Sequence, residues 1–184
     1  MRKSKSARLK ALAAEIAAAP LPLRESNLVF GEGNTDCTVM FIGEAPGANE
    51  DRMKRPFVGR SGRLLDKLLG EIGWKRDDVY ITNIVKRRPP DNRAPQADEI
   101  EAYKPYLARQ IAIIDPAIIV TLGRFAMNYF LPNAKISLDH GRICAVEGRQ
   151  IVPLYHPAAA LRSGKMLDAL SADFKKLPAF LSNN

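Results

Sequence analysis

The stretch TVMFIGEAPGANED, residues 38–51, changes character in its middle. Its first six residues are mostly apolar and include Val39 and Ile42, a composition typical of a short buried strand. The residues that follow, GEAPG, combine glycine, proline and a carboxylate, which favour a turn over a helix or a strand. In open α/β sheets ligands bind beyond the carboxyl ends of the strands, so this loop is the first candidate for a functional site.

Helical and strand-like segments alternate along the rest of the chain. The predicted strands cover residues 38–43, 79–85, 117–123 and a fourth run within 149–157. The predicted helices cover residues 61–74, with Ser61 as the expected N-cap, and residues 96–114, 124–130 and 166–177. Strands that alternate with helices predict an α/β fold, a three-layer α/β/α sandwich with a central, mainly parallel four-stranded sheet.

A single domain is expected to span residues 1–184, a length that one hydrophobic core can serve. Residues 1–27 are expected to form a helix and an extended segment packed on that domain. Leu9, Leu12 and Ile16 lie at helical spacing, and this pattern favours an ordinary amphipathic helix over a mitochondrial-type presequence.

Composition and charge narrow the class of partner. No apolar run reaches the ~18–20 residues of a membrane span, so no membrane partner is expected. The two cysteines, Cys37 and Cys144, give no disulfide framework and favour a cytoplasmic protein, associated with the nucleoid in a bacterium. The formal net charge of +8 suits a polyanionic partner, and general solubility is the alternative interpretation.

The GEAPG loop by itself leaves two other interpretations open. A glycine-rich loop after a strand could hold a phosphate, but this one matches neither the P-loop nor the dinucleotide-binding pattern. Glu44 would also repel a phosphate group. The loop could equally be a structural turn whose acidic residues face solvent.

Four motifs together carry more information than any one of them. They are GEAPGANED, RPFVGRSGRLLD, YITNIVKRRPPDNRAP and YHPAAALR, in this order along the chain. In order and spacing they resemble the uracil-DNA glycosylase superfamily, most closely its family 4, over roughly residues 28–177. The resemblance implies an enzyme of base excision repair that flips uracil out of DNA and hydrolyses the N-glycosidic bond, which leaves an abasic site.

The resemblance also implies roles for residues that recognise the base. Phe57 would stack on the flipped uracil, and Asn83 would pair with its Watson–Crick edge. His156 would donate a hydrogen bond to uracil O2 as charge develops there. Without the motifs, Phe57 is equally a core residue and Asn83 a strand-end cap. The implied substrate contacts are those of Gly43, Ala45, Pro46, Gly47, Asp51, Phe57 and Asn83.

Two acidic residues are candidates to position the attacking water or to stabilise the cationic sugar. The best-known uracil-DNA glycosylases have an aspartate where this chain has Ala45. Glu44 and Glu50 are then the nearest carboxylates, and Glu44 is favoured because it follows the strand directly. Asp51 has the alternative role of holding the loop.

Basic residues flank these motifs and are candidate DNA contacts. Arg87 and Arg93 belong to this basic group, and Ser61 and Gly62 could offer backbone N–H groups to a phosphate. Leu161 is a candidate wedge that invades the duplex. The predicted DNA-binding residues are Arg60, Ser61, Gly62, Arg63, Lys86, Arg88, Leu161 and Arg162.

The chain departs from family 4 at the four cysteines that hold an iron–sulfur cluster in that family. The matching positions carry Ala19, Pro22, Arg87 and Tyr103. None of these side chains can replace a thiolate, so no cluster and no other cofactor is expected. Apolar packing of Ala19, Leu21, Pro22 and Tyr103 is expected to fill that corner instead.

Three functional hypotheses follow. The first is an active uracil-DNA glycosylase that acts as a monomer on single- or double-stranded uracil-containing DNA. The second is a tight or covalent uracil-DNA binder, disfavoured because KRRPPDNRAP has neither the inserted basic loop nor the histidine of such relatives. The third is a catalytically silent nucleic-acid-binding module, supported by Ala45 and the missing cysteines.

Overall fold

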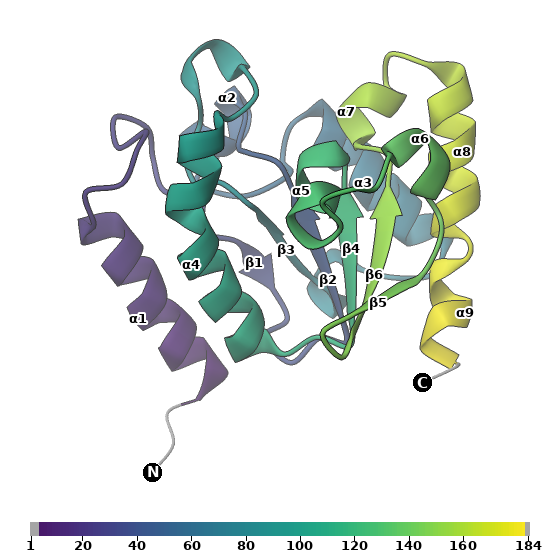
Figure 1. Cartoon of the computed structure of the whole chain (residues 1–184), viewed down its shortest axis with the longest axis horizontal. Helices are drawn as coiled ribbons and strands as arrows, with labels where there is room; N and C mark the ends of the chain where they lie inside the picture. The colour runs from purple at the N-terminus through teal and green to yellow at the C-terminus, as the bar shows by residue number, and fades with distance from the viewer. Residues whose placement is uncertain (1–3, 183–184) are drawn as a thin grey trace.

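A computed structural model describes residues 4–182, and within this range the chain forms a six-stranded sheet between two layers of helices (Figure 1). The strand order is β1-β3-β2-β4-β6-β5. The inner strands pair in parallel: β3 (Tyr80–Asn83), β2 (Val39–Gly43), β4 (Ile118–Leu122) and β6 (Arg149–Leu154). These four inner strands are the ones that the sequence predicts.

Two short edge strands correct the predicted strand number from four to six. At one edge β1 (Glu32–Gly33) pairs with β3, and at the other β5 (Cys144–Val146) pairs with β6. Both pairs are antiparallel. Strands of two and three residues are too short to produce an alternating pattern, so nothing local in the sequence identifies them.

The residues of the inner strands alternate between two hydrophobic cores. In β2, Met40 and Ile42 pack with residues of α1 (Lys5–Ala18) and α4 (Ala97–Ile114). Phe41 faces the other way and packs with α3 (Arg60–Glu71) and α8 (Gly164–Phe174). Successive side chains of a strand point to opposite faces, so one strand contributes to both layers. This arrangement confirms the predicted α/β/α sandwich.

The remaining elements are short and connect the main layers. They are the helices α2 (Ala48–Met53), α5 (Arg124–Phe130), α6 (Ile136–Asp139), α7 (Pro157–Ala160) and α9 (Leu177–Ser182), and the 3-10 turns η1 (Arg76–Asp78) and η2 (Pro90–Asn92). The N-cap of α3 is Gly59 instead of the predicted Ser61. The helix predicted over residues 166–177 is instead α8 followed by α9.

Helix α1 confirms the expected amphipathic pattern. Leu9, Leu12 and Ile16 are buried and belong to the core that α4 shares. Figure 1 shows α1 beside α4. None of the helices between residues 4 and 182 combines the length and the apolarity that a membrane crossing requires.

Candidate functional site

A cavity of about 160 Å³ lies at the carboxyl ends of the parallel strands. Ala45 follows β2, Asn83 ends β3, and His156 comes two residues after β6. Segments that are far apart in the sequence therefore meet at one edge of the sheet. The residues that line the cavity are Ala45, Gly47, Glu50, Phe57, Ser61, Asn83, His156 and Ala158.

Asn83 presents an unsatisfied acceptor in this wall. Its side chain is 2% exposed, and its buried Oδ1 has no hydrogen-bond partner in the described part of the chain. Leaving such a group unpaired costs about 1–3 kcal/mol, so an orphan of this kind needs an explanation. The absence of a partner indicates that Oδ1 is available to a donor on a ligand.

Gly43 makes room for the two side chains beside it. A Cβ atom at this position would lie 2.4 Å from Asn83 Oδ1 and 2.5 Å from Phe57 Cζ. Both separations are shorter than a van der Waals contact, so only glycine allows this approach. Gly43 and Pro46 are both buried and do not line the cavity.

His156 is held in one tautomer. Its Nδ1 accepts a hydrogen bond of 3.0 Å from the backbone N–H of Ala158, so the ring proton is on Nε2. Burial lowers the pKa of His156 to about 4, although the Glu50 carboxylate raises it. The ring is therefore neutral at pH 7 and offers one N–H donor.

Phe57 adopts a backbone conformation that is unusual for a large residue. Its φ is +51°, in the left-handed region that costs a non-glycine residue about 1–2 kcal/mol. The ring is nearly fully buried and stacks near His156, with 5.7 Å between ring centroids. The phenyl ring belongs to a hydrophobic core and lines the cavity as well.

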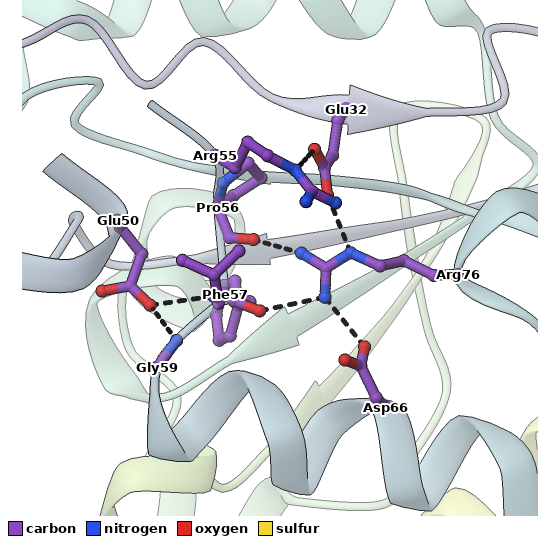
Figure 2. A network of polar contacts seen from close by, with 9 residues as sticks. Glu32, Glu50, Arg55, Pro56, Phe57, Gly59, Asp66 and Arg76 are labelled. Carbon is purple, nitrogen blue, oxygen red and sulfur yellow. Dashed lines mark hydrogen bonds and ion pairs between the residues drawn. The ribbon is translucent and has the colours of Figure 1, made fainter. Parts of the chain in front are cut away.

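Glu50 ties the loop of Phe57 to the GEAPG loop. Its Oε1 accepts hydrogen bonds from the backbone N–H groups of Val58 (2.9 Å) and Gly59 (2.7 Å). Its Oε2 accepts a bond of 3.2 Å from the N–H of Gly47. Figure 2 shows the carboxylate directed at Gly59 from α2. Glu50 thus lines the cavity and organises two of its loops.

The other two acids lie apart from the cavity wall. Glu44 is half-buried and is not among the lining residues, and burial raises its pKa while nearby Arg124 lowers it. Asp51 Oδ1 accepts a bond of 2.7 Å from the N–H of Asn27. This contact holds the N-terminal segment, instead of the GEAPG loop, to α2.

A larger cavity of about 330 Å³ adjoins the first and shares Gly47, Glu50, Ser61 and Ala158 with it. Arg60, Leu161 and Arg162 line its outer part, and Leu161 is 40% exposed. Four of the predicted DNA contacts therefore gather at the mouth of the inner cavity. We call this larger cavity the outer groove.

The other four predicted DNA contacts, Gly62, Arg63, Lys86 and Arg88, do not line the outer groove. Arg63 is exposed on α3, and Arg88 is half-buried with its Nε 2.7 Å from Asn92 Oδ1. Gly62 is buried, and a Cβ there would lie 1.9 Å from the Phe57 carbonyl oxygen. Gly62 therefore lets α3 approach Phe57 closely. The sequence analysis predicted only a phosphate contact for Gly62 and missed this packing role.

The prediction that Lys86 contacts DNA is wrong, because its side chain is fully buried and cannot reach a phosphate. Its Nζ donates to Thr82 Oγ1 (2.6 Å), to the Asn83 carbonyl (2.7 Å) and to Gln110 Oε1. Burial lowers the pKa of this amine well below its usual value. Arg87 is also buried and donates to the Ser26 carbonyl, so it is not a DNA contact either.

The sequence analysis missed two asparagines of the outer groove. Asn49 and Asn92 line it beside the predicted basic residues. Asn92 and its neighbour Asp91 both have positive φ values, of +55° and +54°. The run PPDN already signals a tight turn, but not that its tip faces the groove.

The four positions of the missing cysteines lie in a corner that protein groups fill. The Tyr103 hydroxyl donates a 2.7 Å hydrogen bond to the Pro22 carbonyl, and the ring is fully buried. Burial raises the pKa of Tyr103 to about 12, against the effect of Arg87, so the hydroxyl remains a donor. Leu21 packs on the same core, as predicted.

These residues do not fit an iron–sulfur cluster. Cluster iron is held by thiolates, and this corner offers a phenol, a guanidinium and a backbone carbonyl instead. Among the residues that the structure describes, no three His, Cys, Asp or Glu side chains gather as a metal site would need.

His140 is partly buried and paired. Its Nδ1 lies 2.6 Å from Asp173 Oδ2, and its ring packs on Tyr155 with 4.6 Å between centroids. The pair links the segment before β5 to α8, which gives His140 a structural role.

Comparison with known proteins agrees with this geometry. The sequence model of the uracil DNA glycosylase superfamily matches residues 30–179. The chain is 48% identical over 164 residues to a type-4 uracil-DNA glycosylase of Sulfurisphaera tokodaii, with 83% of this chain and 74% of that protein covered. It is 43% identical over 169 residues to a type-4 uracil-DNA glycosylase of Thermotoga maritima, at 89% and 88% coverage. A type-5 uracil-DNA glycosylase of Pyrobaculum aerophilum is 31% identical over 144 residues, at 68% and 63% coverage.

Proposed function

The chain belongs to the uracil-DNA glycosylase superfamily, and from that premise we propose that it excises uracil from DNA. The enzyme flips the nucleotide out of the strand and hydrolyses the bond between uracil N1 and the sugar C1′. The products are free uracil and an abasic site, which base excision repair then processes.

The observation that carries this proposal is the orphan Oδ1 of Asn83, beside the rings of Phe57 and His156. Uracil presents an N3–H donor and an O4 acceptor on one edge, and an amide presents the matching acceptor and donor. Cytosine has an acceptor at N3 and a donor at N4, so it would leave both groups of the amide mismatched. Asn83 therefore selects uracil over cytosine.

His156 stabilises the leaving base. When the C1′–N1 bond breaks, its electron pair remains on uracil, and negative charge develops on O2. A neutral imidazole whose proton is on Nε2 donates a hydrogen bond to that oxygen and keeps its proton. The low pKa of His156 supports this role at pH 7.

A carboxylate completes the reaction at the sugar. The water oxygen bonds to C1′, and the water gives up a proton as the cationic sugar becomes the abasic alcohol. We assign the water to Glu44, because it directly follows β2 and is the chain neighbour of Ala45, which lines the cavity. Glu50 holds the loops and adds negative charge beside the cationic sugar.

The outer groove holds the DNA around the flipped nucleotide. Arg60 and Arg162 contact phosphates, with Arg63 and Arg88 nearby, and the free N–H groups at the start of α3 assist. Leu161 fills the space that the extruded base leaves in a duplex. Such binding is independent of sequence and weakens as salt rises.

We further propose that the enzyme works without an iron–sulfur cluster. Tyr103, Pro22 and Arg87 provide the contacts of that corner, and the reaction steps above use none of them.

One experiment tests the proposed function. The protein is incubated with a uracil-containing oligonucleotide and then with alkali, which cleaves the strand at abasic sites. We expect strand cleavage at uracil and none in a matched oligonucleotide with cytosine at the same position. A covalent protein–DNA band would instead identify a uracil-DNA binder, and an intact strand would leave only the catalytically silent module.

A further inference from the structure

The loop that carries Phe57 is held by Arg76 on the side away from Glu50 (Figure 2). Arg76 begins the turn η1, nineteen residues further along the chain. Its Nη1 donates a 2.9 Å hydrogen bond to the Phe57 carbonyl, and its Nη2 donates to the Pro56 carbonyl. One guanidinium thus fixes two successive carbonyl groups.

Arg76 is itself held by carboxylates from two other elements. Its Nε donates to Glu32 Oε1 of β1 at 2.8 Å, and its Nη1 lies 2.8 Å from Asp66 Oδ1 of α3. The side chain is 18% exposed, so these partners replace most of its water. Bonds at all three nitrogens leave the guanidinium little freedom to turn.

These contacts explain how Phe57 keeps its left-handed backbone. Arg76 binds the carbonyls of Pro56 and Phe57, while Glu50 binds the N–H groups of Val58 and Gly59. The chain is therefore bonded immediately before and after the residue with φ of +51°. Such strained residues persist where their surroundings determine the conformation, often at ligand sites.

We infer that Arg76 is a positioning residue for base recognition, which acts through the ring of Phe57. This inference rests on the proposed function, because the ring is taken to stack on the flipped uracil. Arg76 lines neither the inner cavity nor the outer groove, so it reaches the base only through the loop.

Arg55 provides a matched control. Its Nε and Nη2 bind the two oxygens of Glu32, at 2.7 and 3.0 Å, so it shares a carboxylate with Arg76. Its side chain makes no hydrogen bond to the carbonyls of Pro56 or Phe57 in the structure as described. Arg55→Met therefore removes a charge from the same network and leaves the loop contacts in place.

The test is a double-mutant cycle on single-turnover excision of uracil from a single-stranded oligonucleotide. We expect Arg76→Met to lower the rate constant by about 10²-fold, the scale for misplacing a group by about 1 Å. In the Phe57→Ala background the same substitution should change the rate by no more than about twofold, because the ring it positions is gone. Arg55→Met should stay within about twofold of the wild type.

Arg76→Lys covers the case in which Arg76→Met does not fold. Lysine keeps the charge but not the fork of donors, so we expect a loss of about tenfold that also disappears in the Phe57→Ala background. Equal losses in both backgrounds would show that Arg76 only supports the fold. Equal losses for Arg55→Met and Arg76→Met would assign the effect to the charge of the network.

A second readout separates this inference from the proposed function. If the wild type excises no uracil, the proposed function fails, but crystal structures of Arg76→Met and Arg76→Lys still decide the role of Arg76. We expect Phe57 to leave the left-handed region in both variants and to keep it in Arg55→Met. A Phe57 φ that stays near +51° in the Arg76 variants would overturn the inference.

Discussion

Asn83 should contribute to activity without contributing to stability. Its Oδ1 makes no hydrogen bond in the described structure, so Asn83→Ala removes a buried, unpaired acceptor and breaks no bond at that atom. We expect uracil excision to fall by at least about 10²-fold, the usual effect of losing one aligned transition-state donor or acceptor. Thermal unfolding should change little. The same loss of rate is expected for His156→Ala.

Single-turnover rates and melting temperatures of both variants check this prediction. A rate near that of the wild type in either variant would remove the role assigned to that residue. A large fall in melting temperature for Asn83→Ala would show that the amide is structural.

His156 should make stability depend on pH in a defined window. Its pKa is about 4 in the folded protein and 6.5 in the free side chain. Between these values the unfolded chain binds a proton that the folded protein does not bind. The free energy of unfolding should therefore fall as pH drops from about 6.5 towards 4, by about 3 kcal/mol in all.

The comparison that isolates this effect is with His156→Gln, which cannot titrate. Chemical denaturation of both proteins between pH 4 and 7 should show a steeper decline for the wild type. Parallel curves would mean that burial does not lower the pKa of His156, since other titrating groups contribute equally to both proteins.

Substitutions of Glu44 and Glu50 should differ in their effects on stability as well as on the excision rate. Glu44→Gln should slow cleavage more than Glu50→Gln, because we assign the water to Glu44. Glu50→Gln should lower the melting temperature more, since a glutamine has one acceptor oxygen for the three N–H groups that Glu50 binds. The reverse order of rates would assign the water to Glu50, which lines the cavity.

At the scale of elements, Tyr103 connects α4 to the N-terminal segment, and this contact should contribute to the free energy of unfolding. Tyr103→Phe removes the hydroxyl that binds the Pro22 carbonyl and should cost about 1–3 kcal/mol. Tyr103→Ala should cost about 3–5 kcal/mol, because it also leaves a cavity in the core. At temperatures at which they remain folded, both variants should excise uracil at the rate of the wild type.

Because protein groups fill the corner where relatives hold the iron–sulfur cluster, we expect the purified protein to be colourless. Chelators should change neither the melting temperature nor the excision rate, and iron analysis should find no stoichiometric metal. A brown preparation with bound iron, lost together with stability on chelation, would contradict the proposal that Tyr103 and its partners replace the cluster.

The main elements could be predicted because their signals are local. The apolar runs of β2 and β4 and the spacing of Leu65, Leu68 and Leu69 in α3 are visible in the sequence itself. The edge strands β1 and β5 were missed, because strands of two and three residues depend on a neighbour that lies far away in the chain.

The site was predictable only in part, and for the same reason. The motifs identify Asn83, Phe57 and His156, but nothing in VKRRPP shows that Lys86 is buried while other basic residues are exposed. In the fold, its buried amine donates a hydrogen bond to Gln110, which lies twenty-four residues away in the chain. The contacts of Arg76 with Glu32 and Asp66 likewise join residues from three elements.

At the scale of the whole molecule, the exposed Leu161 should distinguish two forms of DNA. A duplex has to be opened at the flipped base, whereas a single strand has no partner base to separate. Leu161→Ala should therefore lower excision from double-stranded DNA more than from single-stranded DNA, by about tenfold or more, since unstacking a base step costs a few kcal/mol. Equal losses on both substrates would mean that Leu161 serves only the fold.

The edge strands have a consequence for how such molecules behave together in a crowded solution. An open sheet ends in rows of free N–H and C=O groups, to which the sheet of another molecule can be added. Here β1 and β5 occupy these positions with strands of two and three residues. Strands of this length leave little template for a further strand to be added at either edge. We therefore expect the two edge strands, which do not line the cavity, to disfavour edge-to-edge association of this sheet with other copies.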